Sequence, residues 1–389
     1  MTAGYDVVVV GGRVAGAATA LHLARRGVRV LVLDRGSAGS DTLSTHALMR
    51  AGVLQLHRWG LLDRLVAAGV PPVRSTVFHH VSGDTHISLR PAAGVDALYA
   101  PRRTTLDALL VDAAVEAGAE VRHGVRVTGL LRGAGGRVVG VHAEDRAGSA
   151  FDVPARITVG ADGVRSTVAQ QVAAPTDRQG SAAAGVLYTY LADLPAEGYE
   201  WFYGHRASAG FIPTEDGLTC AFAATGAPRF RGLPGRGADR FAQLLAEAAP
   251  AAAARVAGGQ QVEGLRGFGG VPGRLRRAGG PGWALVGDAG YYKDPLSTHG
   301  MSDALRDAEL LALALTGALD GAVPEAAALA AFQQQRDRLS TSLFEVTEQV
   351  AGHTLEEERL RHLLRELSAA MSDEIEALLA LDRRPTAVA

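Results

Sequence analysis

The chain has 389 residues, of which 47% are hydrophobic and 21% charged, and its net charge at pH 7 is −2. This length allows two or three domains, and this balance is ordinary for a folded globular protein. The low net charge excludes long-range attraction of nucleic acid or an anionic membrane. Cys220 is the only cysteine and Lys293 the only lysine, so intramolecular disulfides and a cysteine zinc cluster are excluded as well.

The start of the chain carries no signal for export. Residues 1–6 pass directly into a valine run without a basic segment before it, and no apolar stretch reaches the roughly 18 residues of a membrane span. We therefore expect a cytoplasmic protein that binds neither nucleic acid nor membrane. Monomer and homodimer both stay open.

The first 160 residues alternate between strand and helix patterns. A β-branched run at 7–10, a helical pattern at 15–25 and a second strand at 28–33 predict a βαβ unit. Later elements of this part are expected as a helix at 106–116 and strands at 119–122, 125–131, 138–143 and 157–159.

The middle and the end of the chain follow different patterns. Short alternating strands at 180–267, with one helix at 239–254, predict a separate antiparallel sheet to which 74–89 adds strands. A buried strand is expected at 283–286, and the chain is helical after Ser302. Thr354 and Glu357 fit a capping box at the start of the last helix.

The first motif with chemical content is Gly11-Gly12-Arg13-Val14-Ala15-Gly16, between the first strand and the first helix. Asp34 closes the second strand. Such glycines tighten the turn, the helix N-terminus binds a pyrophosphate, and the acid binds ribose hydroxyls. Arg13 replaces the usual middle glycine, so its side chain must swing away from the phosphates. The alternative is a plain strand-to-helix turn.

Two further motifs combine glycine with an acid directly after a strand. Gly160-Ala161-Asp162-Gly163 follows the strand at 157–159, and Gly287-Asp288-Ala289-Gly290 follows the strand at 283–286. Either motif alone is compatible with an acidic turn. The glycine-rich run at 133–136 has no helix behind it, so we interpret it as a hairpin turn and not as a second nucleotide motif.

Together the three motifs resemble those of the class A FAD-dependent monooxygenase superfamily, the para-hydroxybenzoate hydroxylase-like flavoproteins, over residues 5–319. Geranylgeranyl reductases and flavin-dependent halogenases are related to it. The resemblance implies an α/β fold with a Rossmann-type, glutathione-reductase-like FAD-binding domain, an antiparallel-sheet substrate domain and C-terminal helices. The implied boundaries are 1–75, 99–175 and 265–322 for the FAD-binding domain, 76–98 and 176–264 for the substrate domain, and 323–389 for the helices.

The resemblance also implies which residues bind FAD. They are Gly11, Gly12, Arg13, Val14, Ala15, Gly16, Asp34, Arg35, Arg50, Arg103, Val127, Asp162, Gly287, Asp288, Pro295, Gly300 and Met301. Of these, Asp288 is expected at the ribityl chain, and Asp162 near the pyrophosphate, in a position linked to nicotinamide use. A helix that begins near Gly300 would direct its positive end at the flavin and stabilise the reduced anion. No metal is expected.

Two Ser-Thr-His triplets end at His46 and His299, each beside an expected flavin loop. Both histidines are candidate catalytic residues that orient substrate or assist proton transfer. The alternative is that the hydroxyls of the triplets only cap turns or helices. Substrate contacts are expected from Tyr203, His205 and Phe211 of the middle sheet, although each also suits core packing.

The function that the resemblance implies is hydroxylation. Reduced by NADPH or NADH, FAD would react with O2 to a C4a-hydroperoxyflavin and oxygenate a small aromatic or polyketide-like molecule. A geranylgeranyl-reductase-like reductase or oxidase that acts on a double bond shares these motifs and stays open, as does a non-catalytic flavin-binding protein. Halogenation is disfavoured because no paired tryptophans precede Ile212-Pro213 and Lys293 lies in the flavin loop.

Overall fold

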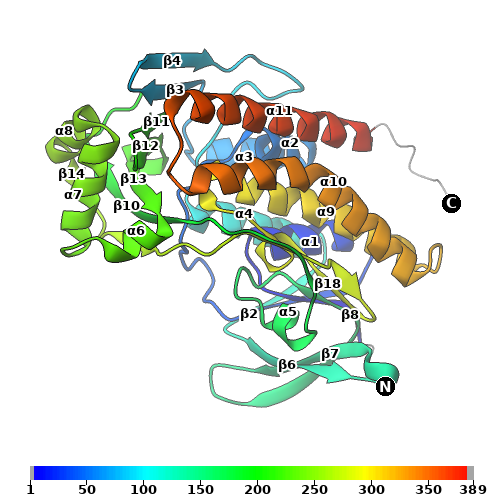
Figure 1. The fold of residues 1–389 in the computed structure, drawn as a ribbon. Coiled ribbons are helices and arrows are strands. Elements are labelled where there is room, and N and C mark those ends of the chain that lie inside the picture. The colour runs from blue at the N-terminus through cyan, green and yellow to red at the C-terminus, as the bar shows by residue number, and fades with distance from the viewer. Residues whose placement is uncertain (1–3, 383–389) are drawn as a thin grey trace.

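A parallel sheet forms the centre of the N-terminal part in the computed structural model, which describes residues 4–382 (Figure 1). Its strands pair in parallel in the order β18, β8, β1, β2, β5. Their bounds are Tyr5–Val10 (β1), Val30–Asp34 (β2), Glu120–His123 (β5), Ala150–Gly160 (β8) and Trp283–Leu285 (β18). Beside β18 lies β17 (Gly279–Gly280), and β8 continues into an antiparallel ribbon with β7 (Val138–Glu144) and β6 (Arg126–Arg132).

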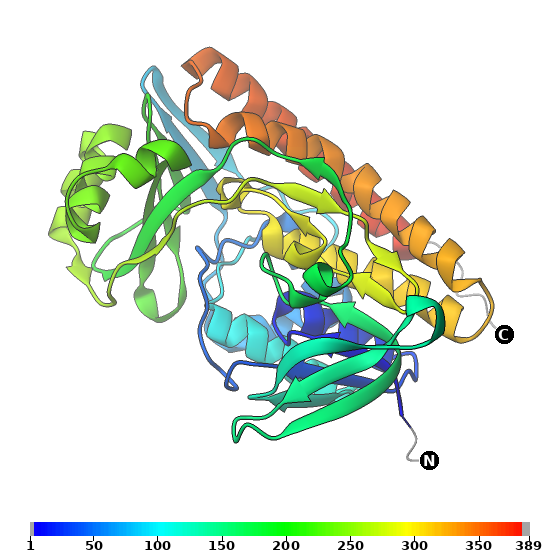
Figure 2. The same cartoon turned by 60° about the horizontal axis from the view of Figure 1, so that its bottom comes forward.

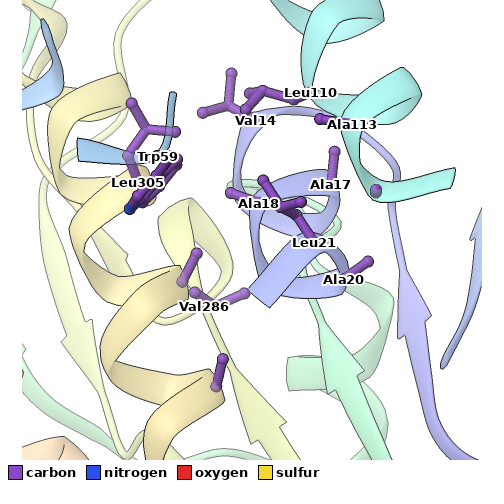
Figure 3. Close-up of a cluster of buried hydrophobic side chains, with 14 of the residues drawn as sticks. Val14, Ala17, Ala18, Ala20, Leu21, Trp59, Leu110, Ala113, Val286 and Leu305 are labelled. Atoms are coloured by element: carbon purple, nitrogen blue, oxygen red, sulfur yellow. The ribbon is translucent and has the colours of Figure 1, made fainter. Parts of the chain in front are cut away.

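Both faces of the parallel sheet are covered, as its continuous valine and leucine runs require. Alternate residues of β1 and β2 belong to two different hydrophobic clusters. One face packs on α1 (Val14–Ala24), α4 (Arg103–Glu116) and α9 (Gly300–Leu319), and the other on β6, β7 and α5 (Thr167–Gln171). Figure 3 shows α1 between Leu110 and Ala113 of α4 and Leu305 of α9, and the small residues Ala17 and Ala18 allow this close packing.

The second large sheet is mostly antiparallel, in the order β14, β10, β13, β12, β11, β3, β4. Its bounds are Ser75–His80 (β3), Gly83–Ser88 (β4), Ala184–Ala192 (β10), Tyr199–Tyr203 (β11), Ser208–Pro213 (β12), Thr219–Gly226 (β13) and Gln260–Gln261 (β14), with β15 (Arg266–Phe268) paired to β10. The expectation that 74–89 joins this sheet is confirmed. Among the described strands of this sheet, only β3 and β11 pair in parallel.

Three helices cover the outer face of this sheet: α6 (Ala227–Gly232), α7 (Gly237–Ala248) and α8 (Pro250–Gly258). The single helix expected at 239–254 is therefore wrong. Ala249 has extended backbone angles and Pro250 begins the next helix, because proline disfavours a helical residue before it. The inner face turns toward the loops before α2 (Arg50–Arg58) and α4.

The remaining elements are short. A three-stranded sheet joins β9 (Thr176–Gln179), β16 (Arg274–Arg276) and β19 (Tyr291–Tyr292), and α3 (Leu62–Ala67) follows α2. The glycine run at 133–136 turns the β6–β7 hairpin through a short 3-10 helix, η1 (Ala134–Gly136), which confirms the hairpin interpretation. Another 3-10 turn, η2 (Glu215–Gly217), connects β12 and β13.

The helical C-terminal part consists of α10 (Glu325–Ala351) and α11 (Glu357–Asp382), which run side by side next to α9 (Figures 1 and 2). The expected capping box is wrong: α11 begins only at Glu357, whose carboxylate accepts hydrogen bonds from the amide and hydroxyl of Ser82 in the β3–β4 turn. None of the described helices has both the length and the apolar composition needed to cross a bilayer.

Candidate cofactor and substrate site

The three glycine motifs meet at one edge of the parallel sheet. Val10 of β1 pairs with Leu33 of β2 and with Gly160 of β8, and Gly160 pairs in turn with Leu285 of β18. The carboxyl ends of these strands therefore lie together, and each motif follows one of them. This edge is where open parallel sheets bind nucleotides.

Close packing around the first turn of α1 explains the glycines. Gly11 has φ +101°, and a Cβ there would lie 2.5 Å from the carbonyl oxygen of Ala161. A Cβ on Gly16 would overlap the carbonyl oxygen of Gly11, and one on Gly287 would lie 2.7 Å from the Cβ of Ala15. The first motif thus touches the other two directly.

The N-terminus of α1 suits a pyrophosphate. Its first turn contains no acidic residue, no side chain caps it, and the amides of such a turn have no partners within the helix. Asp34 lies beside it at the end of β2 and accepts 2.6 Å hydrogen bonds from the amides of Gly12 and Gly36. Gly12, Asp34 and His123 are among the residues that line a cavity of about 90 Å³, which also borders α4. These donors and this carboxylate fit the ADP half of FAD.

Arg13 points away from this helix terminus, as its position in the motif requires. Its guanidinium donates to Asp107 at 2.9 Å and to the carbonyl oxygen of Ser40 at 2.5 Å. Arg103 donates to both carboxylate oxygens of the same Asp107, at 3.0 and 3.2 Å. Arg13 and Asp107 thus line the cavity, Arg103 is held next to it by the same acid, and Arg35 is exposed.

Asp162 and Asp288 differ in their partners. One oxygen of Asp162 accepts hydrogen bonds from the amides of Thr167 and Val168 and so caps α5, while its Oδ1 is buried without a partner. The carboxylate of Asp288 accepts no hydrogen bond from any residue in the described range 4–382. Burial raises the pKa of Asp288, and the charge of Lys293 opposes this shift. Each aspartate thus has a carboxylate oxygen next to α1 that accepts no hydrogen bond from the described residues. This oxygen is available to a hydroxyl group of FAD.

Arg50 and Val127 have other surroundings. Arg50 donates from Nη2 to the carbonyl oxygen of Arg90 at 2.6 Å, while its Nη1 is buried without a partner and free to serve a ligand. The side chain of Val127 packs in the hydrophobic cluster below the sheet and does not line the cavity. Contact through this side chain is therefore not supported, and only its backbone is available to FAD.

The loop before α9 contains exposed residues next to buried ones. It contains η3 (Gly287–Ala289) and η4 (Pro295–Ser297). Pro295 and Gly300 are exposed, Met301 is half-buried, and a Cβ on Gly300 would meet no atom within 4 Å. No side chain caps α9 at its start. This leaves room for a planar ring against a helix N-terminus, as expected for the flavin.

The two candidate histidines are both buried, in different places. His46 is 1% exposed, has φ +67°, and forms a short hydrogen bond through Nε2 with the hydroxyl of Tyr190. Burial and the charges of Arg102 and Arg103 lower the pKa of His46 to about 3. His299 is fully buried and pairs through Nε2 with Glu374 of α11. No side chain caps α2 or α9, so neither triplet caps a helix. The hydroxyl of Ser44 does cap a turn, because it accepts a hydrogen bond from the amide of His46 at 3.0 Å.

A network of charged side chains lies beside His46 and could not be predicted from the sequence. Arg102 lies 4.0 Å above the ring of Tyr190 and donates to Glu263 at 2.6 Å. Arg266 donates to Asp41 at 2.6 Å and to Glu263 at 2.9 Å. These residues come from segments far apart in sequence, namely two strands of the second sheet and three loops, so no local pattern could have revealed them.

The three expected substrate residues do not share one site. Tyr203 belongs to the inner face of the second sheet, with Tyr188, Tyr190, Tyr199 and Trp201. His205 is exposed in the turn after β11, and it lines a small surface pocket together with Tyr203 and His353. Phe211 is on the outer face, packed in the cluster under α7 and α8 with Arg255 4.7 Å from its ring centre. A substrate contact by Phe211 is therefore not supported, since neighbouring residues of a strand point to opposite faces.

The comparison with protein families agrees with this geometry. Residues 4–347 match the family described as "FAD binding domain", and the chain belongs to that family. The resemblance to the class A flavoprotein superfamily, the α/β fold class and FAD as the cofactor are thereby confirmed.

Similar proteins and structures differ in their activities. Protein FixC of Salmonella typhi is 32% identical over 180 residues, which are 43% of this chain and only 39% of FixC. Digeranylgeranylglycerophospholipid reductase of Methanosarcina acetivorans is 25% identical over 319 residues, 77% of this chain and 72% of the reductase. Among solved structures, the flavin-dependent brominase Bmp2 has a TM-score of 0.79 at 19% identity, covering 98% of this chain and 100% of Bmp2. P. aeruginosa PqsL in complex with 2-aminobenzoylacetate has a TM-score of 0.78 at 22% identity, covering 93% and 100%. At these identities the two structures show the fold alone.

Proposed function

We propose that this protein is an FAD-dependent monooxygenase that hydroxylates a small aromatic or polyketide-like molecule, with NADPH or NADH as electron donor. The observation that carries the proposal is the aromatic inner face of the second sheet. Tyr188, Tyr190, Tyr199, Trp201 and Phe222 form one cluster there, and this cluster includes Ala47, next to His46, from the expected flavin loop.

The partly exposed members of the cluster provide the substrate contacts. Met49, Phe78, Val186 and Tyr203 are half-buried, while the tyrosines around them are closed off. Flat apolar surfaces of this kind suit aromatic rings, which bury large areas and stack at offsets. The binding of 2-aminobenzoylacetate by PqsL, a protein of the same fold, adds support for a small aromatic ligand.

The residues of the site have separate roles in this reaction. FAD supplies the transfer of electrons and the activation of O2. The first turn of α1, with Asp34, Asp162 and Asp288, holds it. His46 and Tyr190 form the polar pair nearest the aromatic face. The imidazole of His46 stays neutral, and its Nδ1, which has no partner among the described residues, is available to accept a hydrogen bond from a substrate hydroxyl.

Reduction of a substrate double bond is the second candidate, favoured by the similarity to the Methanosarcina reductase over 77% of this chain. It would use the same FAD site without O2. Halogenation has less support from the residues, because Lys293 is 5% exposed and ion-paired with Asp303. Its amine is therefore not free to face a substrate.

The test is an anaerobic reduction of the FAD-loaded protein by NADPH or NADH with a panel of phenolic, anilinic and polyketide-like compounds. Faster bleaching of the flavin with one compound, followed by a product heavier by one oxygen atom in air, would establish hydroxylation. A product heavier by two hydrogens, formed without air, would instead identify a double-bond reductase. A flavin that neither nicotinamide reduces would contradict the proposed electron donor.

A further inference from the structure

A fully buried cluster of charged side chains adjoins the loop before α9. Its members come from four segments of the chain and are each at most 5% exposed. They are Lys293 after β19, His299, Asp303, Arg306 and Asp307 at the start of α9, Ser340 of α10, and Glu374 of α11. The family match ends at residue 347, so Glu374 belongs to a helix outside it.

Every carboxylate in the cluster is paired. Asp303 binds Lys293 through Oδ2 and Arg306 through Oδ1, the latter at 3.1 Å. Glu374 binds His299 through Oε2 and Arg306 through Oε1, the latter at 2.8 Å. Arg306 also binds Asp307, at 2.7 Å. The Nδ1 atom of His299 remains buried without a partner among residues 4–382.

This arrangement is an ion-pair network and not a cation site. His299, Asp303 and Glu374 each offer one atom within 4.8 Å of the others, which is close enough for a shared ion. However, both oxygens of Asp303 and of Glu374 already accept hydrogen bonds from cationic or imidazole groups of the chain. A metal ion would have to displace Lys293 and Arg306.

The charges of the network do not balance when His299 is neutral. Asp303, Asp307 and Glu374 are three anions, while Lys293 and Arg306 are two cations. Arg336 of α10 also acts on Asp307, but its charge is balanced by Asp337 at 2.6 Å. A buried negative charge that no cation balances raises the free energy of the folded protein, so the network favours the binding of one additional proton. Lys293 also faces the ring of Tyr291, 4.8 Å away, and the Asp288 carboxylate, which adds to the negative charge around the network.

We propose that Glu374 is a positioning residue that makes His299 a proton acceptor for the neighbouring FAD, so that reduction of the flavin is coupled to uptake of a proton at His299 Nδ1. The inference uses only the FAD site and not the identity of the substrate. It assigns α11 a role in the redox chemistry of the domain on which it packs.

Reduction of a bound flavin by two electrons and one proton would add one negative charge beside this network. One proton from water would then bind His299 Nδ1 and offset that charge, so that two electrons and two protons are taken up in all. In the oxidised protein His299 is neutral, since burial lowers its pKa and Glu374 only partly offsets the shift. A negative charge next to it raises that pKa.

The test is the midpoint potential of bound FAD between pH 6 and 8, with dithionite as reductant. For a two-electron couple, each proton taken up contributes about 30 mV per pH unit. We expect the wild type to approach about 60 mV per pH unit, and Glu374→Gln and His299→Gln to fall to about 30 mV. Glu376→Gln, an exposed site on the same helix, is the matched control and should resemble the wild type.

Several results would overturn the proposal. A wild-type slope of about 30 mV per pH unit would exclude coupled uptake. Equal slopes in the wild type and both variants would show that the second proton resides on the flavin itself or elsewhere. Weaker FAD binding in Glu374→Gln with an unchanged slope would mean a purely structural role. If Glu374→Gln does not fold, His299→Gln decides alone. Because dithionite replaces nicotinamide, a failure here is distinguishable from a failure of the proposed hydroxylation.

Discussion

The carboxylate of Asp107 holds both Arg13 and Arg103, at 2.9 and 3.0 Å. This shared ion pair explains how an arginine is tolerated inside a glycine-rich phosphate turn: the guanidinium is directed toward α4 and leaves the amides of α1 accessible.

We therefore expect Arg13→Gly to retain FAD, with a dissociation constant within about threefold of the wild type, since surface ion pairs contribute about 0–1 kcal/mol. Fluorescence titration of the apoprotein with FAD measures this. Loss of FAD binding would show that Arg13 itself contacts the phosphates.

Gly16→Ala should abolish FAD binding and lower the free energy of unfolding. The added Cβ would overlap the carbonyl oxygen of Gly11, and backbone on both sides cannot yield cheaply. We expect a loss of several kcal/mol in the free energy of unfolding, as for other overpacked sites. Gly232→Ala is the control, because a Cβ at that exposed position meets no atom within 4 Å. Similar urea midpoints for the two variants would contradict this packing.

Asp288→Ala should purify with less flavin, because it removes an acceptor that has no protein partner and is expected to bind FAD hydroxyls. A loss of about 1.5–3 kcal/mol, the usual range for hydrogen bonds to charged groups, would weaken binding by tenfold or more. The flavin-to-protein absorbance ratio measures occupancy. Full occupancy, equal to that of an exposed control such as Asp320→Ala, would refute the assignment of Asp288.

The stability of the protein should fall between pH 7 and pH 5 because histidines are buried in neutral form. Burial lowers the pKa of His22 to about 4 and that of His46 to about 3, so the unfolded chain, with a pKa near 6.5, binds protons that the folded chain does not. Stability is then lost as the pH falls through about 6.5, by up to about 2 kcal/mol per histidine at pH 5. Urea unfolding of His22→Leu should show a smaller loss, whereas the exposed His362→Leu should behave as the wild type. An unchanged pH dependence in His22→Leu would disprove this cause.

The sequence predicts the FAD-binding half of this molecule well, for a local reason. Each glycine motif directly follows a strand, and the register of β1, β2, β8 and β18 then brings the motifs together. The periodicity of single segments also predicts the strands of the second sheet. It does not predict which face of the sheet each aromatic side chain occupies: Phe211 and Tyr203 both belong to short strands and lie on opposite faces.

The charged networks were beyond sequence reasoning because their partners are distant. Glu374 meets His299 across 75 positions, and Arg266 meets Asp41 across 225. The helix break at Pro250 and the absent capping box are different cases. Pro250 itself indicates the helix break in the sequence. The capping box does not form because Glu357 accepts a hydrogen bond from Ser82, in another part of the chain.

The most direct measurement is the mass of the product formed under ¹⁸O2 by the protein with NADPH or NADH and the compound that most accelerates flavin bleaching. Our account predicts that one ¹⁸O atom enters the product, and that Tyr190→Phe and His46→Gln lower the yield while keeping FAD bound. A product without ¹⁸O, or one formed equally well without oxygen, would contradict the assignment of this flavoprotein as a monooxygenase.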